Sequence, residues 1–230
     1  MTRTLADVDG PHADAPLAVA GAPAAASKAA LVALHGRGGT PEGLLRLLEE
    51  WVPAGVTLLA PGARRSSWLP AGHDEPVAEL EPALSSAVDC VAQSLSVASA
   101  VGEGGIPAER TMFLGVSQGG CVLAEFLRRR PQRFGGAFLV SAALPGTDPS
   151  GRAVEGDLAG TPVALDSTEA DPYVSPERVR GTAAVLEAGG AAVDCRIEPG
   201  DAHGLSDETG ERVGDALAEI VEAADEEVSA

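Results

Sequence analysis

The stretch Leu114-Gly115-Val116-Ser117-Gln118-Gly119-Gly120 decides the fold of this chain. An apolar run over 111–116 leads into it and predicts a buried strand, whereas the pattern over 118–130 predicts a helix. Glycines stand two residues before and two residues after Ser117. They leave room for a sharp strand-to-helix turn, which lifts the serine hydroxyl above the end of the strand.

The rest of the chain repeats the alternation of short apolar runs with longer helical patterns. The runs are continuous, as is typical of strands buried on both faces, and the alternation predicts an α/β fold with a mostly parallel sheet and helices on both faces. The predicted strands are 30–34, 56–60, 111–116, 137–140, 161–165 and 193–197, with a weaker one at 17–20. The predicted helices are 41–51, 79–101, 118–130, 176–188 and 207–224, of which the last is capped by Ser206.

A length of 230 residues suits a single domain over 1–230 with no large cap domain. Two stretches rich in proline and glycine, 61–78 and 144–158, are predicted to be loops, and the first is the candidate for a partial lid. The acidic ends, 1–14 and 225–230, are predicted to be loose tails.

Composition excludes several classes of protein. With 16 basic and 34 acidic residues the formal charge is −18, which argues against nucleic acid and anionic membranes as partners. Cys90, Cys121 and Cys195 form no CxxC pair, so neither a disulfide set nor a metal site is expected. Asp7 and Asp9 lie where a signal peptide would need an apolar segment, and we therefore predict a cytoplasmic protein. The oligomeric state stays open, a homodimer included.

The acidic character has two possible sources. Lys28 is the single lysine, and every other basic residue is arginine. A halophilic origin accounts for a strongly acidic surface, while a GC-rich genome accounts for arginine in place of lysine. We favour halophily because coding bias alone does not explain a charge of −18.

A serine hydroxyl needs a base before it can act as a nucleophile, so a histidine is expected near Ser117. The chain has four: His12 in the acidic N-terminal segment, His35 at the end of a strand, His73 in the 61–78 loop, and His203. His203 is favoured because it lies in the loop between the last strand and the last helix, at the same sheet edge as Ser117.

An acid should follow the penultimate strand, in the chain order serine, acid, histidine. Asp166 lies at the end of that strand and Asp171 lies further on, in front of Pro172. Both are candidates at this point, and the proline turn before a capped helix favours Asp171.

The turn His35-Gly36-Arg37-Gly38-Gly39 follows an early strand. Its backbone N–H groups, together with the N–H of Gln118 after the serine, could form an oxyanion hole. The alternative is an ordinary strand-to-helix turn. Phosphate binding is disfavoured because neither GxGxxG nor a P-loop lysine is present.

Taken in order, these motifs resemble the phospholipase/carboxylesterase family of α/β-hydrolases, which includes acyl-protein thioesterases, lysophospholipases and small bacterial and archaeal carboxylesterases. The resemblance runs from residue 29 to the last helix, and the arginine in HGRGG is closer to the prokaryotic carboxylesterase branch. The matching motifs are HGRGG (35–39), APGA…SSW (60–68), GVSQGG (115–120), GTPV (160–163), DPYVSPERV (171–179) and GDAHGLS (200–206).

The resemblance implies an α/β-hydrolase fold and a set of site residues. It implies Ser117 as nucleophile, His203 as base and Asp171 as the acid that orients the base. It also implies an oxyanion hole from the backbone N–H groups of Arg37 and Gln118. Trp68 matches a tryptophan that lines the family's substrate pocket, and we expect its neighbour Leu69 to bind substrate as well.

We therefore predict a serine carboxylesterase that hydrolyses small-molecule esters of short to medium chain length through an acyl-serine intermediate, with no cofactor and no metal. One alternative is a thioesterase or lysophospholipase that uses the same triad. Another, of a different class, is a non-catalytic binding protein with the α/β-hydrolase fold.

Overall fold

The central element of the protein is a single mixed sheet. The computed structural model describes residues 1–102 and 104–229, and within them eight strands pair in the order β1-β2-β4-β3-β5-β6-β7-β8. β2 runs antiparallel to β1 and β4, and the other neighbouring pairs are parallel. The strands are β1 (Thr2–Thr4), β2 (Pro16–Gly21), β3 (Ala29–Leu34), β4 (Val56–Pro61), β5 (Thr111–Val116), β6 (Gly136–Val140), β7 (Pro162–Thr168) and β8 (Ala192–Glu198).

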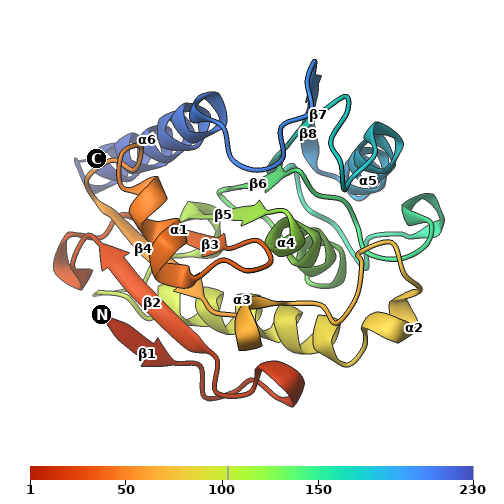
Figure 1. Cartoon of the computed structure of the whole chain (residues 1–230). Helices are drawn as coiled ribbons and strands as arrows, with labels where there is room; N and C mark the ends of the chain where they lie inside the picture. Colours follow the sequence, from red (N-terminus) through yellow and green to blue (C-terminus); the bar gives the residue numbers. More distant parts are fainter. Residues whose placement is uncertain (103, 230) are drawn as a thin grey trace.

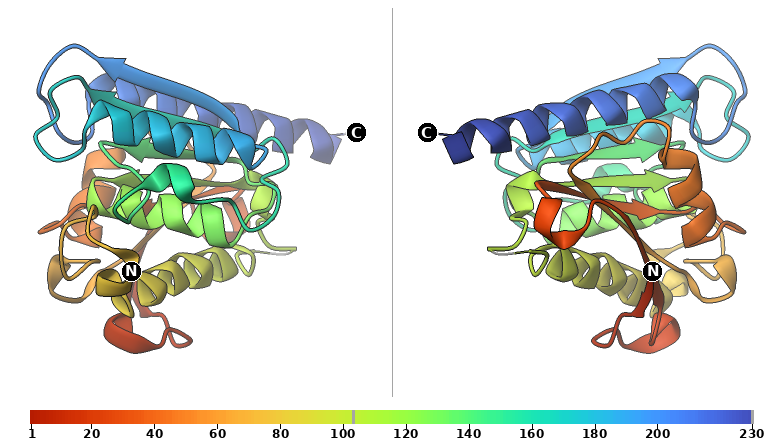
Figure 2. Two further views of the ribbon diagram at one scale, coloured as in Figure 1. Left: turned by 90° about the vertical axis from the view of Figure 1, so that its right-hand side faces the viewer. Right: turned by 90° about the vertical axis from the view of Figure 1, so that its left-hand side faces the viewer.

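Helices cover both faces of this sheet (Figure 1). α1 and α6 pack on one face, and α3, α4 and α5 pack on the other, as Figure 2 shows from two sides. In the described ranges, none of the helices combines the length and apolar character needed to cross a membrane. The helices are α1 (Pro41–Leu48), α2 (Val77–Leu80), α3 (Ala83–Ala98), α4 (Gln118–Arg129), α5 (Pro176–Ala188) and α6 (Asp207–Ser229).

The predicted α/β class and its mostly parallel sheet are confirmed. All six residues of β3 and all six of β4 are buried, which explains why their sequences are continuous apolar runs rather than alternating ones. Alanine, valine and leucine fill most of the two core layers, and the few aromatic rings of Phe113, Phe126 and Phe134 pack on one another. Thr40 and Ser206 accept hydrogen bonds from the amides of Gly43 and Thr209, and so they cap α1 and α6; the Ser206 cap is as predicted.

The helix predicted over 79–101 is wrong in its first turns. The structure has a short helix, α2, followed by α3, with Glu81 and Pro82 between them. Pro82 has no N–H and its ring obstructs the preceding turn, so the chain cannot continue one helix through it. α3 ends at Ala98, three residues before the predicted end.

The N-terminal segment is not a loose tail. β1 pairs with β2, and Leu5, Val8 and His12 are buried. The acidic residues of this segment are exposed to solvent. Its acidic composition therefore predicted a loose tail, although its apolar residues are buried in the core. The predicted loose C-terminal tail is also helical, because α6 continues to Ser229; Ala230 lies outside the described residues.

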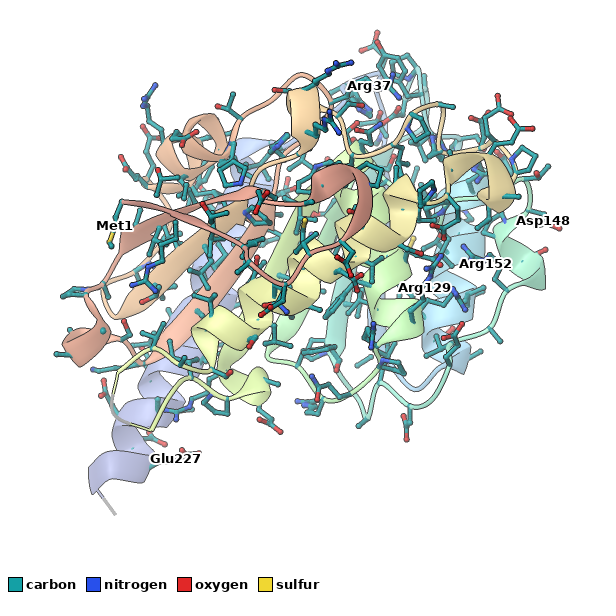
Figure 3. The ribbon with its side chains drawn as sticks, turned by 90° about the horizontal axis from the view of Figure 1, so that it is seen from below. Met1, Arg37, Arg129, Asp148, Arg152 and Glu227 are labelled. Carbon is teal, nitrogen blue, oxygen red and sulfur yellow. The ribbon has the colours of Figure 1, made fainter. Side chains whose placement is uncertain are left out.

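A buried carboxylate ties α4 to the 144–158 loop. The Glu125 side chain is fully buried, and it accepts hydrogen bonds from Arg128, Arg129 and Arg152. Figure 3 shows Arg129 and Arg152 on the same side of the molecule. Burial opposes ionisation of Glu125, but the guanidinium groups of Arg152, Arg128 and Arg129 outweigh it and lower the pKa of Glu125 to about 2.

The sheet brings the sequence motifs to one edge. β3, β5, β7 and β8 are parallel to their neighbours, so the segments that follow their carboxyl ends meet there. These segments are the 35–39 turn, Ser117, the 169–175 loop and the 199–206 loop.

Candidate active site

Ser117 lies at the turn between β5 and α4 in a strained backbone conformation. Its φ and ψ are 54° and −122°, a region that residues with a side chain rarely adopt. Close packing explains the flanking glycines: a Cβ on Gly115 would lie 2.6 Å from the Cα of Gly120, and one on Gly119 would lie 2.5 Å from the Leu34 carbonyl oxygen. The turn therefore holds the Ser117 hydroxyl at the carboxyl end of β5 and the first turn of α4.

His203 lies beside this hydroxyl. The distance from His203 Nε2 to Ser117 Oγ is 2.7 Å, although the two residues are 86 positions apart in the chain. The loop that carries the imidazole is held on both sides. The Gly204 amide donates to Ser141 Oγ at 3.0 Å, and the Thr168 hydroxyl donates to the Ala202 carbonyl at 2.8 Å.

Asp171 lies on the far side of the same imidazole. Its two carboxylate oxygens are 2.8 and 3.0 Å from His203 Nδ1, and one of them also accepts the amides of Tyr173 and Val174. Burial opposes ionisation of Asp171, but the amides and His203 outweigh it, so the pKa of Asp171 is lowered. An ionised carboxylate only accepts, so Nδ1 carries the proton and Nε2 is left to accept the Ser117 hydroxyl proton.

Asp166, the other acid left open by the sequence, points elsewhere. It accepts hydrogen bonds from the Arg212 guanidinium at 2.6 and 2.7 Å and from the Thr209 hydroxyl at 2.9 Å. These bonds attach the end of β7 to α6. Of the two acids, only Asp171 contacts His203 in the described part of the chain.

The 35–39 turn passes directly over Ser117. A Cβ on Gly36 would lie 3.3 Å from Ser117 Cβ, and the Gly38 amide donates to the Ser66 carbonyl at 2.7 Å. Within the described residues, the Arg37 amide donates no hydrogen bond. The Gln118 side chain points toward Trp68, because its Oε1 accepts the Trp68 amide at 2.7 Å. The two predicted oxyanion-hole amides therefore belong to backbone segments that adjoin Ser117.

The prediction that Trp68 and Leu69 line the pocket is wrong. Trp68 is 0% exposed and Leu69 is 2% exposed, and neither belongs to the wall of the cavity at Ser117. The Trp68 indole donates to the His35 carbonyl at 2.8 Å, and its ring packs against those of His35 and His12. Trp68 therefore stabilises the 35–39 turn from the interior of the protein. The 61–78 loop reaches the cavity further along the chain, at Ala71, Gly72 and His73.

The cavity at Ser117 has a volume of about 480 Å³. Several residues of its wall were not predicted from the sequence, although their positions offered a signal. Cys121 is one helical turn after Ser117, Tyr173 and Val174 follow Asp171, and His73 lies in the predicted lid loop. Tyr173 is exposed, and its ring packs edge-on against that of His203, with 4.7 Å between the ring centroids. The cavity is lined by Arg37, Ala71, Gly72, His73, Ser117, Gln118, Cys121, Tyr173, Val174 and His203.

Among the residues described, the side chains form no group of three or more histidines, cysteines or acids that could hold a metal ion.

The fold and the site define the chain as an α/β-hydrolase with a serine, a histidine and an acid in hydrogen-bond contact. Neither a family model nor a curated protein matches the sequence. Solved structures do. A phospholipase/carboxylesterase from Dyadobacter fermentans is 32% identical, with a TM-score of 0.78 over 88% of this chain and 95% of the other.

Two further structures share the fold at lower identity. A carboxylesterase from Bacillus cereus is 21% identical, with a TM-score of 0.68 over 90% of this chain and 94% of the other. A carboxylesterase from Mesorhizobium loti is 23% identical, with a TM-score of 0.67 over 94% and 98%. The chain belongs to the phospholipase/carboxylesterase family, and it is an esterase-type hydrolase.

Proposed function

We propose that the protein is a serine carboxylesterase that hydrolyses short- to medium-chain esters through an acyl-Ser117 intermediate. The observation that carries this proposal is the unbroken chain of contacts from Ser117 Oγ to His203 Nε2 and from His203 Nδ1 to Asp171. A serine, a base and an acid that orients the base are the three groups that acyl transfer requires.

In the first half of the reaction, Ser117 Oγ attacks the ester carbonyl while His203 Nε2 takes the hydroxyl proton. Asp171 keeps Nδ1 protonated and stabilises the imidazolium that forms. The amides of Arg37 and Gln118 donate to the carbonyl oxygen as it becomes negative, and the N-terminus of α4 adds its dipole. His203 then gives its proton to the leaving alcohol, and the acyl group stays on Ser117.

In the second half, a water molecule takes the place of the alcohol. His203 removes a proton from this water, the hydroxide attacks the acyl carbonyl, and the proton passes to Ser117 as the carboxylic acid leaves. Each half-reaction uses the same groups, so no further catalytic side chain is required.

The dimensions of the cavity support small substrates. Its volume of about 480 Å³ lies within the range of small-molecule sites, and part of its wall is apolar, with Ala71, Cys121 and Val174. A short acyl chain can contact these side chains while the ester carbonyl stays at Ser117. We expect p-nitrophenyl butyrate and hexanoate to be hydrolysed much faster than the palmitate.

The decisive experiment compares Ser117→Ala with Ser167→Ala. Both variants remove one hydroxyl near the same sheet edge, but Ser167 is buried, lies outside the Ser117 cavity, and its Oγ has no partner within the described residues. We expect Ser117→Ala to abolish both ester hydrolysis and labelling by a fluorophosphonate, and Ser167→Ala to retain both. Wild-type-like turnover by folded Ser117→Ala would refute the mechanism.

These assays, extended to thioester and lysophospholipid substrates, separate the alternative functions. A non-catalytic binding protein would show neither labelling nor turnover. A thioesterase would cleave a butyryl thioester faster than the matched oxygen ester, and a lysophospholipase would prefer a lysophospholipid to p-nitrophenyl butyrate.

A further inference from the structure

Arg37 is a cation in the cavity wall of a strongly acidic protein. The chain has a formal charge of −18, and several of its arginines bind carboxylates, among them Arg129, Arg152 and Arg212. In the described part of the chain, no carboxylate oxygen lies within 4.0 Å of the Arg37 guanidinium, which donates instead to the Ala71 carbonyl at 2.7 Å. Figure 3 shows Arg37 at one end of the molecule, away from Arg129 and Arg152. Its charge therefore remains available to a ligand.

His73 is the second polar group of the cavity wall without an assigned role. It lies two residues after Ala71, so the Arg37 guanidinium and the His73 ring border the same short stretch of loop. Its Nε2 is buried and has no hydrogen-bond partner among the described residues. Burial, assisted by the positive charge of Arg178, lowers the pKa of His73, so its ring is neutral at neutral pH and has one N–H to donate.

The backbone holds both groups in place. The His73 carbonyl accepts the Gly146 amide at 2.8 Å, which ties the 61–78 loop to the 144–158 loop. The Gly38 amide donates to the Ser66 carbonyl, which ties the Arg37 turn to the start of the same loop. A site held on two sides loses little conformational freedom when a ligand binds.

Three other polar side chains of the wall already have partners. Ser117 and His203 bind each other, and the Gln118 amide group binds the backbone of Trp68 and Leu69. Two acids, Asp74 and Asp171, act on His73 through their charge. Asp171 is bound to His203 and to two amides, and Asp74 is exposed; neither lines the cavity.

We propose that Arg37 and His73 form an anion subsite that selects esters carrying a carboxylate close to the ester bond. Arg37 contributes a permanent positive charge at the exposed rim, and His73 contributes one hydrogen bond from inside the wall. A carboxylate accepts from both donors at once, whereas an alkyl group of the same length leaves both without a partner. This inference rests on the proposed esterase function and specifies its substrate class.

The test is a matched set of esters. On the acyl side, mono-p-nitrophenyl glutarate is compared with p-nitrophenyl valerate. On the alcohol side, the butyrate ester of 4-hydroxybenzoate is compared with that of 4-hydroxybenzamide. The measured quantity is the ratio of kcat/KM for the anionic ester to kcat/KM for its neutral partner, which cancels changes that affect both esters equally.

We expect the wild-type protein to favour the anionic ester in at least one of the two pairs. In that pair, Arg37→Gln should lower the ratio about tenfold, mainly through the KM of the anionic ester, as expected for loss of a hydrogen bond to a charged group. Arg37→Lys should restore part of the ratio, and His73→Phe should lower it several-fold. Because the subsite is partly exposed, molar salt should also reduce the preference.

Arg65→Gln is the matched control. Arg65 is an exposed arginine of the 61–78 loop, which also carries His73, and it does not line the cavity. The variant therefore removes the same charge without touching the subsite. If Arg65→Gln lowers the ratio as much as Arg37→Gln, the preference comes from the overall electrostatic field of the protein, and the proposed subsite is refuted. It is refuted equally if the wild type hydrolyses the neutral esters with no anionic preference, or if Arg37→Gln and His73→Phe leave the ratio unchanged. Failure of the wild type to hydrolyse any ester would instead overturn the proposed esterase function.

Discussion

Replacing Asp171 by asparagine tests the proposed mechanism most sharply, because the change alters one atom that contacts His203. In the native site one carboxylate oxygen accepts the amides of Tyr173 and Val174 at 2.9 and 3.0 Å, and an asparagine carbonyl can keep both bonds. The other oxygen, 2.8 Å from His203 Nδ1, becomes an NH₂ group. The loop should therefore stay folded. The nearer partner of His203 Nδ1 changes from an acceptor to a donor, and only the retained carbonyl oxygen, 3.0 Å from Nδ1 and already bound to two amides, can still accept from it.

This change acts through the tautomer of His203. An NH₂ donor opposite Nδ1 favours a bare Nδ1 and a protonated Nε2, and a protonated Nε2 cannot accept the Ser117 proton across the 2.7 Å contact. The imidazolium of the transition state also loses its anionic partner. We expect kcat to fall by about 10⁴, equivalent to about 5.5 kcal/mol of transition-state stabilisation.

The assay is the rate of p-nitrophenyl butyrate hydrolysis, measured with the melting temperature of each variant. Asp166→Asn is the control, because it removes a carboxylate of the same strand-loop region that binds Arg212 and Thr209 rather than His203. Asp166→Asn should lower the melting temperature and keep kcat within a few-fold of wild type. A folded Asp171→Asn protein that loses less than about tenfold, or an Asp166→Asn protein that loses more than Asp171→Asn, would show that the acid is misassigned.

Three further predictions concern stability and packing. Glu125→Gln should destabilise the protein by about 3 kcal/mol, because it leaves Arg128, Arg129 and Arg152 without the buried carboxylate that they share. Since the pKa of Glu125 is lowered to about 2, its contribution to stability is complete above the unfolded pKa and disappears as the pH falls from about 4.5 to 2. Acid titration of the melting temperature measures this loss. Melting temperature should rise from low to molar KCl because salt screens the charge of −18, whereas a flat or falling curve would favour coding bias over halophily. Trp68→Phe should cost about 1–3 kcal/mol because it leaves the buried His35 carbonyl unpaired, yet it should not change chain-length preference; a shift in that preference would restore Trp68 to the pocket wall.

The sequence by itself was enough for the class of fold and for the position of Ser117 at the turn between a strand and a helix. Both depend on short-range features: continuous apolar runs mark strands buried on two faces, and the glycines around Ser117 mark a turn in which packing leaves no space for a Cβ. His203 was also within reach, because the loops after parallel strands meet at one sheet edge whatever their exact geometry.

Tertiary structure decided the rest. Asp166 lies near the carboxyl end of β7, and Asp171 lies five residues later in the loop that follows. Only the direction of each side chain separates their roles: Asp166 points toward Arg212 and Asp171 toward His203. Trp68 faces the interior rather than the cavity because its indole N–H finds the His35 carbonyl there. The N-terminal segment is held by burial of Leu5 and Val8, which its many acids concealed. Local sequence patterns record spacing along the chain, whereas these outcomes depend on which distant groups complete a hydrogen bond or exclude water from an apolar surface.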